Sequence, residues 1–273
     1  MHKIKKASIL EGNNMFSDST FKLLNSLTDK TTKSEEKSPS KLESPFVFFD
    51  LNLSSEQKST LAALKISQDE SFENNGNFKN ILTDIEKFIS ALDKQNAEIS
   101  VKMAELILEI INKVISEMRQ ESAWIVMRSS QPNDAFKDPR WHTDGFYFPP
   151  YEGEQFKVVV TLAGPGTLFY NLPDQQRETF NSLNNDRVNT KKMLENITPV
   201  SPASGQGAAF IAGSKTRAAV HSEPYINSAR LFLAVAPCSH TQLDARLEAQ
   251  KKFESSPEYL ELLSKMQKSF SMK

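Results

Sequence analysis

A histidine and an aspartate lie two residues apart in the stretch RWHTDGFYF, residues 140–148, and both can bind a metal ion. In a β-strand, residues i and i+2 point to the same face, so a strand here would direct His142 and Asp144 toward one ion. The chain has only four histidines. A single His-x-Asp pair is a weak signal, however, because chance or a surface role explains it as well.

A third ligand and a positive charge follow farther along the chain. His221 ends the segment RAAVH, and two histidines with one carboxylate favour non-haem Fe(II) with coordination positions left open. Zinc accepts the same donors, so the residue types alone leave the metal open. Arg230 lies nine residues after His221. If residues 217–221 and 229–236 form an antiparallel hairpin, Arg230 lies near His221, and a buried guanidinium there requires an anionic partner such as a carboxylate.

The elements that must position these residues are expected to be strands. Short apolar runs between residues 123 and 237 are separated by Gly, Pro, Ser and Asn, which indicates a β-sandwich or barrel. Alternation along the last strand would turn one face toward the site and the other toward a layer of helices. The runs are AWIVMR, HTDGFYF, FKVVVTLA, GTLFYNL, QGAAFIAG, RAAVH and ARLFLAVA.

Helical patterns precede the strands. Ser54 followed by Gln57 has the pattern of a capping box at the start of a helix. Apolar residues then repeat at intervals of three and four over residues 78–92 and again over 106–118. This spacing predicts amphipathic helices that pack on a sheet, and we expect residues 46–120 to form a helical segment.

The order of the candidate residues resembles that of the Fe(II)/2-oxoglutarate-dependent dioxygenases, including their prolyl hydroxylase branch. The pattern is His142-x-Asp144, then His221, then Arg230. The strand pair FKVVVTLAGPGTLFY and the closing segment QGAAFIAGSKTRAAVHSEPYINSARLFLAV also resemble that family. The resemblance covers roughly residues 121–238 and leaves out the rest of the chain.

The resemblance implies a mostly β protein with flanking helices, built on a double-stranded β-helix of the jelly-roll or cupin-like kind. It implies that His142, Asp144 and His221 bind Fe(II) and that Arg230 binds the distal carboxylate of 2-oxoglutarate, with Thr161 adding a hydroxyl. O2 would be the co-reactant, and an unknown protein or small molecule would be oxidised while 2-oxoglutarate is converted to succinate.

The remaining segments complete the expected organisation. Residues from about 17 to 45 are rich in Ser, Lys, Glu and Thr, and we expect residues 1–45 to form a flexible polar tail. The helical segment, residues 46–120, is expected to pack on the sheet of the oxygenase core, residues 121–238. A polar insertion at 173–200 interrupts that core, and residues 239–273 form a C-terminal helical segment.

Composition restricts the function less than the motif does. Lys and Arg number 33 against 34 for Asp and Glu, which argues against nucleic acid as a partner. Cys238 is the single cysteine and is read as a small core residue. With no signal-peptide core and no membrane-length apolar run, we expect a cytoplasmic protein without membrane contact; export by a specialised system would leave the same pattern.

Two other functions remain open on the sequence. One is a cupin-like metalloenzyme that does not use 2-oxoglutarate, in which Arg230 contacts the substrate instead. The other is a catalytically silent jelly-roll module that binds a partner through its tail and terminal helices.

Overall fold

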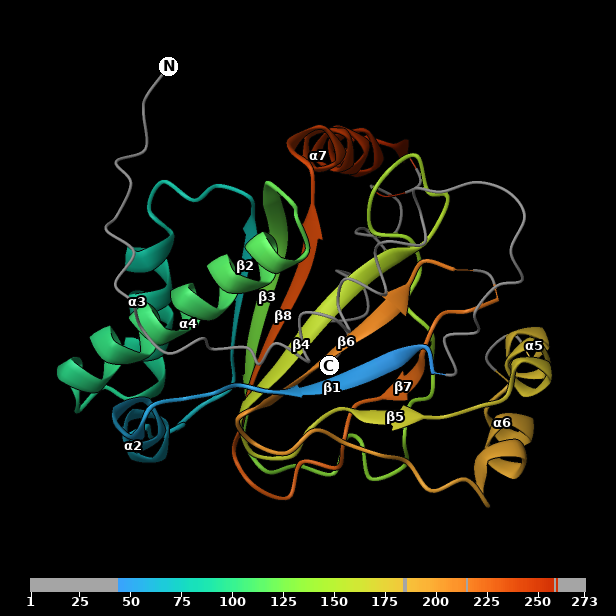
Figure 1. The fold of residues 1–273 in the computed structure, drawn as a ribbon, viewed down its shortest axis with the longest axis horizontal. Coiled ribbons are helices and arrows are strands. Elements are labelled where there is room, and N and C mark those ends of the chain that lie inside the picture. Colours follow the sequence, from blue (N-terminus) through green and yellow to red (C-terminus); the bar gives the residue numbers. More distant parts are fainter. Residues whose placement is uncertain (1–43, 184–185, 215, 258, 260–273) are drawn as a thin grey trace, which may run out of the picture.

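The structure, a computed structural model, describes residues 44–183, 186–214, 216–257 and 259. Two antiparallel sheets form its centre, and helices flank them (Figure 1). The larger sheet has the strand order β1-β6-β4-β8-β3-β2, and the smaller one pairs β5 with β7. The strands are β1 (Phe46–Asp50), β2 (Glu70–Asn75), β3 (Ser122–Ser130), β4 (Gln155–Ala163), β5 (Leu168–Tyr170), β6 (Gln206–Ala212), β7 (Val220–Ser222) and β8 (Arg230–Cys238). The helices are α2 (Ser55–Ala63), α3 (Ile81–Leu92), α4 (Ala97–Glu117), α5 (Asp174–Ser182), α6 (Arg187–Leu194) and α7 (His240–Glu254).

From β3 onward the chain alternates between the two sheets. β3, β4, β6 and β8 belong to the larger sheet, and each segment between them returns to the smaller one. His142 forms a bridge with His221 of β7, β5 pairs with β7, and Val200 forms a bridge with Phe169 of β5. This path is that of a double-stranded β-helix, so the expected fold is confirmed.

One face of β8 packs against helices and the other faces the space between the sheets. Leu231, Leu233 and Val235 are buried in the same cluster as the apolar faces of α3 and α4, which lie along the larger sheet (Figure 1). Ala234 belongs to the cluster on the opposite face. Burying one such leucine side chain contributes about 1.5–3 kcal/mol, so this layer fixes the strand that carries Arg230.

The helices follow their sequence signals. Ser54 and Gln57 form the expected capping box at the start of α2, with the Gln57 amide donating to Ser54 Oγ at 3.1 Å and Gln57 Oε1 accepting from the Ser54 amide at 2.9 Å. The region 46–120 also holds two strands, β1 and β2, at the edges of the larger sheet. Edge strands are short and pair on one side only, so β1 and β2 lack the long apolar runs that would distinguish them from the helical pattern around them.

The predicted hairpin of residues 217–221 and 229–236 is wrong. β7 pairs with β5 in the smaller sheet, whereas β8 lies between β4 and β3 in the larger one. The connection crosses from one sheet to the other, and Ile226 within it forms a bridge with Asn133. Both segments are apolar and extended, and local sequence does not distinguish pairing partners that lie far apart in the chain.

The predicted strand over residues 142–148 is also wrong. Only His142 bridges the smaller sheet, and the following residues are irregular. Pro149 and Pro150 lack the amide hydrogen that a strand would need, which is a physical reason for the chain to leave the sheet.

The outer segments agree with their coarse expectation where they are described. The insertion at 173–200 contains α5 and α6, and α7 begins after Ser239 with a second capping box. Residues 1–43 and 260–273, on which the flexible tail and the end of the C-terminal segment were predicted, lie outside the described residues. No helix in the described ranges is both long and apolar enough to cross a membrane.

Candidate metal centre

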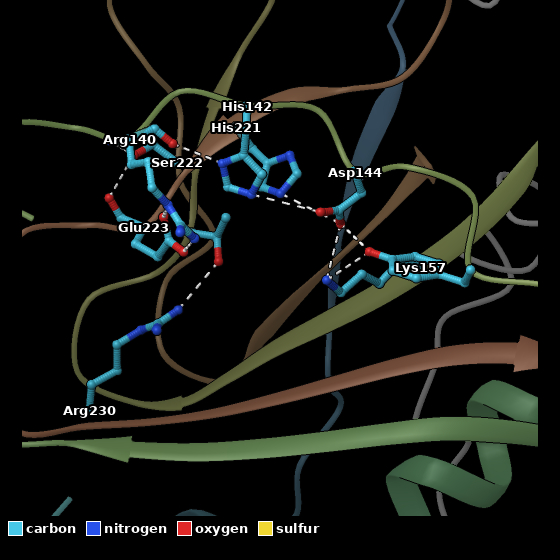
Figure 2. A network of polar contacts seen from close by, with 10 residues as sticks. Arg140, His142, Asp144, Lys157, His221, Ser222, Glu223 and Arg230 are labelled. Carbon is cyan, nitrogen blue, oxygen red and sulfur yellow. Dashed lines mark hydrogen bonds and ion pairs between the residues drawn. The ribbon is translucent and has the colours of Figure 1, made fainter. Parts of the chain in front are cut away.

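Three side chains that can bind a metal meet between the sheets. His142, Asp144 and His221 each present one ligand atom, and these atoms lie within 4.8 Å of one another. His142 and His221 exchange two backbone hydrogen bonds of 2.9 Å, and their ring centroids are 4.3 Å apart. Figure 2 shows both rings directed toward Asp144. The structure thus brings together the three residues that the sequence singled out.

The two imidazoles are held with Nε2 turned inward. His142 Nδ1 lies 2.8 Å from the carbonyl oxygen of Arg140, and His221 Nδ1 lies 3.0 Å from that of Ala219. A carbonyl can only accept, so each Nδ1 carries the proton and each Nε2 keeps a free lone pair. The Nε2 atoms lie 3.7 and 3.6 Å from Asp144 Oδ1 and Oδ2, respectively. Two inward lone pairs and a carboxylate fit a divalent metal ion.

The second oxygen of Asp144 is held by two further side chains. Lys157 Nζ lies 3.0 Å from Asp144 Oδ2, and the Tyr147 hydroxyl donates a hydrogen bond to the same oxygen. Burial alone would raise the pKa of Asp144, but His221 and Lys157, with the hydrogen bonds from Tyr147 and Lys157, outweigh it and hold the pKa well below its usual range. Asp144 is therefore a carboxylate across the physiological pH range.

His221 is neutral under the same conditions. Burial lowers the pKa of His221 to about 4, although Asp144 opposes this and His142 adds to it. A neutral imidazole is the form that binds metal, so His221 does not need to lose a proton at neutral pH.

A cavity of about 270 Å³ extends from these residues to Arg230. Arg230 is only 6% exposed; its Nε donates to the carbonyl oxygen of Pro165 at 2.8 Å, and a terminal nitrogen donates to Thr167 Oγ1 at 3.3 Å. Its guanidinium lies over the ring of Phe232, 4.5 Å from the centroid. Burial lowers the pKa of Arg230 to about 10, which still leaves it cationic at neutral pH. Within the described ranges, Arg230 makes no ion pair with a carboxylate.

Thr161 does not occupy the place that was expected for it. It is buried on β4 opposite Phe232 and is not among the residues that line the cavity. The hydroxyl beside Arg230 belongs to Thr167, which precedes β5 and does line the cavity. Thr161 was expected beside Arg230 because it lies on the strand that follows His142 and Asp144. The loop Gly164-Pro165-Gly166 instead brings Thr167 next to Arg230.

Sequence reasoning also missed Lys157 and Glu223. Lys157 lies two residues before Val159 on an apolar strand and therefore shares its face, and that spacing was the available signal. Glu223 pairs with Arg140 through two hydrogen bonds at the cavity wall. Burial would raise the pKa of Glu223, but the hydrogen bonds from Arg140 lower it on balance. Arg140 and Glu223 lie far apart in the chain, and nothing in the sequence indicates that they pair.

Cys238 is buried, as expected of a core residue. Burial raises the pKa of its thiol to about 12, so it is a poor nucleophile at neutral pH.

Comparison with known proteins finds similarity in solved structures only. No family model matches the sequence, and a search of curated proteins finds no match. A Pseudomonas putida prolyl-4-hydroxylase is 13% identical, with 80% of this chain and 99% of that chain covered and a TM-score of 0.39. A full-length Neurospora crassa protein in complex with alpha-KG and 5-formyluracil is 8% identical, with 81% and 80% covered and a TM-score of 0.41. A Trichoplax adhaerens prolyl hydroxylase in complex with a hypoxia inducible factor peptide is 8% identical, with 83% and 93% covered and a TM-score of 0.39. At these values the fold assignment rests on strand order, and the chemistry rests on the site itself.

Proposed function

We propose that this protein is an Fe(II)/2-oxoglutarate-dependent oxygenase. One observation carries the proposal: a single cavity has a His-Asp-His ligand set on one wall and, on another, a buried arginine without a carboxylate partner among the described residues. Glu223 partly offsets the effect of burial on the pKa of Arg230 but forms no ion pair with it, so an anionic ligand would supply the direct partner that a buried cation needs.

The side chains would divide the work of binding. His142, Asp144 and His221 would hold Fe(II), and the distal carboxylate of 2-oxoglutarate would accept hydrogen bonds from Arg230 and from the hydroxyl of Thr167. Arg230 suits this role because a guanidinium binds a carboxylate through two parallel hydrogen bonds. Iron with 2-oxoglutarate and O2 supplies the oxidation, with 2-oxoglutarate leaving as succinate and CO2.

The rest of the site would keep that set in place and limit the access of water. Lys157 and Tyr147 occupy Oδ2 of Asp144, which leaves Oδ1 for the metal. The apolar cavity residues Val159 and Phe210 reduce the number of water molecules beside the ligands. His221 and Arg230 lie on β7 and β8, so the two sheets set the distance between this ligand and Arg230.

The test measures binding before turnover. Under anaerobic conditions, Fe(II) is expected to bind at one equivalent, and 2-oxoglutarate should raise the melting temperature only when metal is present. His142→Ala should lose metal binding and succinate formation, whereas the matched control His240→Ala, at the exposed start of α7, should keep both. Arg230→Gln should bind metal normally and 2-oxoglutarate poorly.

The outcomes separate this proposal from the other functions. Metal binding without any effect of 2-oxoglutarate would contradict it and favour a metalloenzyme of another chemistry. Failure of every divalent metal to bind would leave a jelly-roll module without catalysis.

A further inference from the structure

The cavity has a wall that neither the metal ligands nor Arg230 use. β3 lies beside β8, on the side away from β4. Trp124, Val126 and Arg128 of β3 all line the cavity. Alternate residues of a strand share a face, so these three form one continuous stripe, about 13 Å long between the first and third Cα atoms. We call this stripe the β3 wall.

The β3 wall lies one strand spacing from β8, which carries Arg230, and farther from the strand that carries Lys157. Val126 pairs with Ala234 of β8, which pairs on its other side with Val159 of β4. Two strand spacings, about 10 Å, therefore lie between the β3 wall and the strand that carries Lys157. Trp124 and Val126 pair with Ala236 and Ala234, which lie farther along β8 from Arg230, so we expect the space over this end of the wall to remain when 2-oxoglutarate is bound at Arg230.

The charge of the β3 wall points to an anion. The side chain of Arg128 is exposed and lines the cavity, and its guanidinium makes no hydrogen bond or ion pair with any residue in the described ranges. Arg140, the other arginine at this mouth, is already paired with Glu223. Arg128 therefore differs from its neighbour because its guanidinium is free to bind a ligand.

The balance of charges over the whole cavity also favours an anionic ligand. Its lining has four permanent cations against two carboxylates, and Fe(II) with the dianion of 2-oxoglutarate adds no net charge. The loaded cavity keeps an excess of positive charge. The four cations are Arg128, Arg140, Lys157 and Arg230, and the carboxylates are Asp144 and Glu223.

The other end of the β3 wall is apolar and rigid. Trp124 is half-buried; its indole N–H donates to Glu73 at 2.8 Å, and the guanidinium of Arg246 lies over its ring at 3.9 Å. Tyr147 meets the same ring at 5.3 Å between centroids. These contacts fix Trp124 as a flat apolar surface, and Val126 continues it toward Arg128.

We propose that the β3 wall binds the substrate and that the substrate is an elongated anion, with an apolar body over Trp124 and Val126 and a carboxylate or phosphate held by Arg128. This inference rests on the proposed function, because it gives the remaining cavity to a substrate. A guanidinium binds either anion through paired hydrogen bonds, so the structure defines the charge and the shape of the ligand.

Arg128 has one competing role, which is to help Arg230 bind 2-oxoglutarate. The two residues lie near the same ring, since Arg128 pairs in register with Phe232 and Arg230 covers it. If both bound one carboxylate, replacing either would weaken 2-oxoglutarate binding. The substrate role predicts instead that only Arg230 does so.

The experiment uses matched acidic and neutral probes. The protein is loaded with Fe(II) and saturating 2-oxoglutarate without oxygen, and calorimetry measures the affinity for three pairs. These are phenylacetate and phenylacetamide, 4-phenylbutyrate and its amide, and benzyl phosphate and benzyl alcohol. The acidic member of at least one pair should bind about tenfold more tightly, the value of one charge-assisted contact. The preferred pair distinguishes carboxylate from phosphate.

Variants assign the preference to Arg128. Arg128→Gln should remove the discrimination and keep the affinity for 2-oxoglutarate. Lys79→Gln removes one positive charge from an exposed position outside this cavity and should keep the discrimination. Equal affinity within every pair, or binding of no probe, overturns the inference, as does a loss of 2-oxoglutarate affinity in Arg128→Gln that matches Arg230→Gln. If wild-type protein with metal does not bind 2-oxoglutarate, the proposed function fails, and the same pairs then test Arg128 with metal alone.

Discussion

Replacing Lys157 with Met removes the positive charge beside Asp144 while keeping a long apolar stem. The pair is largely buried, with side-chain exposures of 19% for Lys157 and 13% for Asp144 and a separation of 3.0 Å. Breaking a buried ion pair from one side costs about 3–5 kcal/mol. Tyr147 still donates to the same carboxylate oxygen, so we expect the lower end, about 3 kcal/mol, for the metal-free protein.

Metal should compensate for much of that loss. A divalent ion at Asp144 supplies the charge that Lys157 no longer gives, so the metal-bound variant should lie within about 1 kcal/mol of the metal-bound wild type. The metal must then stabilise the variant more than it stabilises the wild type.

Urea denaturation with and without Fe(II), under anaerobic conditions, measures both differences. Lys87→Met is the matched control, because Lys87 pairs with Asp84 on the surface at 73% exposure and should change little. Equal metal stabilisation of Lys157→Met and wild type would refute the reasoning, since it would mean that the ion does not sense the charge at Asp144.

Three further outcomes follow from the same structure. The free energy of unfolding of the metal-free protein should fall by about 3 kcal/mol from pH 6.5 to pH 4. In the unfolded chain His221 takes up a proton near pH 6.5, whereas in the folded protein its pKa is about 4 and it stays neutral. Urea titrations in which His221→Gln shows the same fall would contradict this. Gly164→Ala should cost about 1–3 kcal/mol and weaken 2-oxoglutarate binding, because φ is +77° and a Cβ would lie 2.5 Å from Ala229 O and 2.8 Å from Arg230 Cα. Gly153→Ala, with φ of +70° and open space, isolates the cost of the backbone alone and should leave binding unchanged. Ile107→Ala, in the fully buried face of α4, should lower the free energy of unfolding by about 2–5 kcal/mol in thermal or urea denaturation and leave the metal affinity unchanged. An altered metal affinity would mean that the helices on the larger sheet help to position the metal ligands.

The sequence predicted the parts of the fold that local chemistry determines. Periodicity identified α3 and α4, and the capping box at Ser54 gave the start of α2, because both signals act within a few residues. Strand character was also visible, since short apolar runs were separated by turn residues. The pairing of strands was not visible, because β7 and β8 are equally apolar and only the tertiary packing of two sheets assigns them different partners.

The candidate site shows the same division. His142, Asp144, His221 and Arg230 were found because their order along the chain resembles that of the Fe(II)/2-oxoglutarate-dependent dioxygenases. Lys157 was missed because its chemistry depends on which face of β4 it occupies and on a carboxylate that an irregular segment brings to it. The expected geometry of His142 and Asp144 on one strand was wrong, yet the two side chains still converge.

The way they converge assigns different roles to the three ligands. His142 and His221 form a hydrogen-bonded pair across the smaller sheet, and each Nδ1 is tied to a backbone carbonyl, so the backbone fixes both rings. Asp144 lies beyond the sheet, where Gly213 donates to its backbone carbonyl and side chains hold its carboxylate. The histidines therefore define where an ion can sit, whereas Asp144 is the ligand whose orientation depends on neighbouring side chains. Substitutions at Lys157 or Tyr147 should alter one ligand of three, which is why they change the energetics of the site without dismantling it.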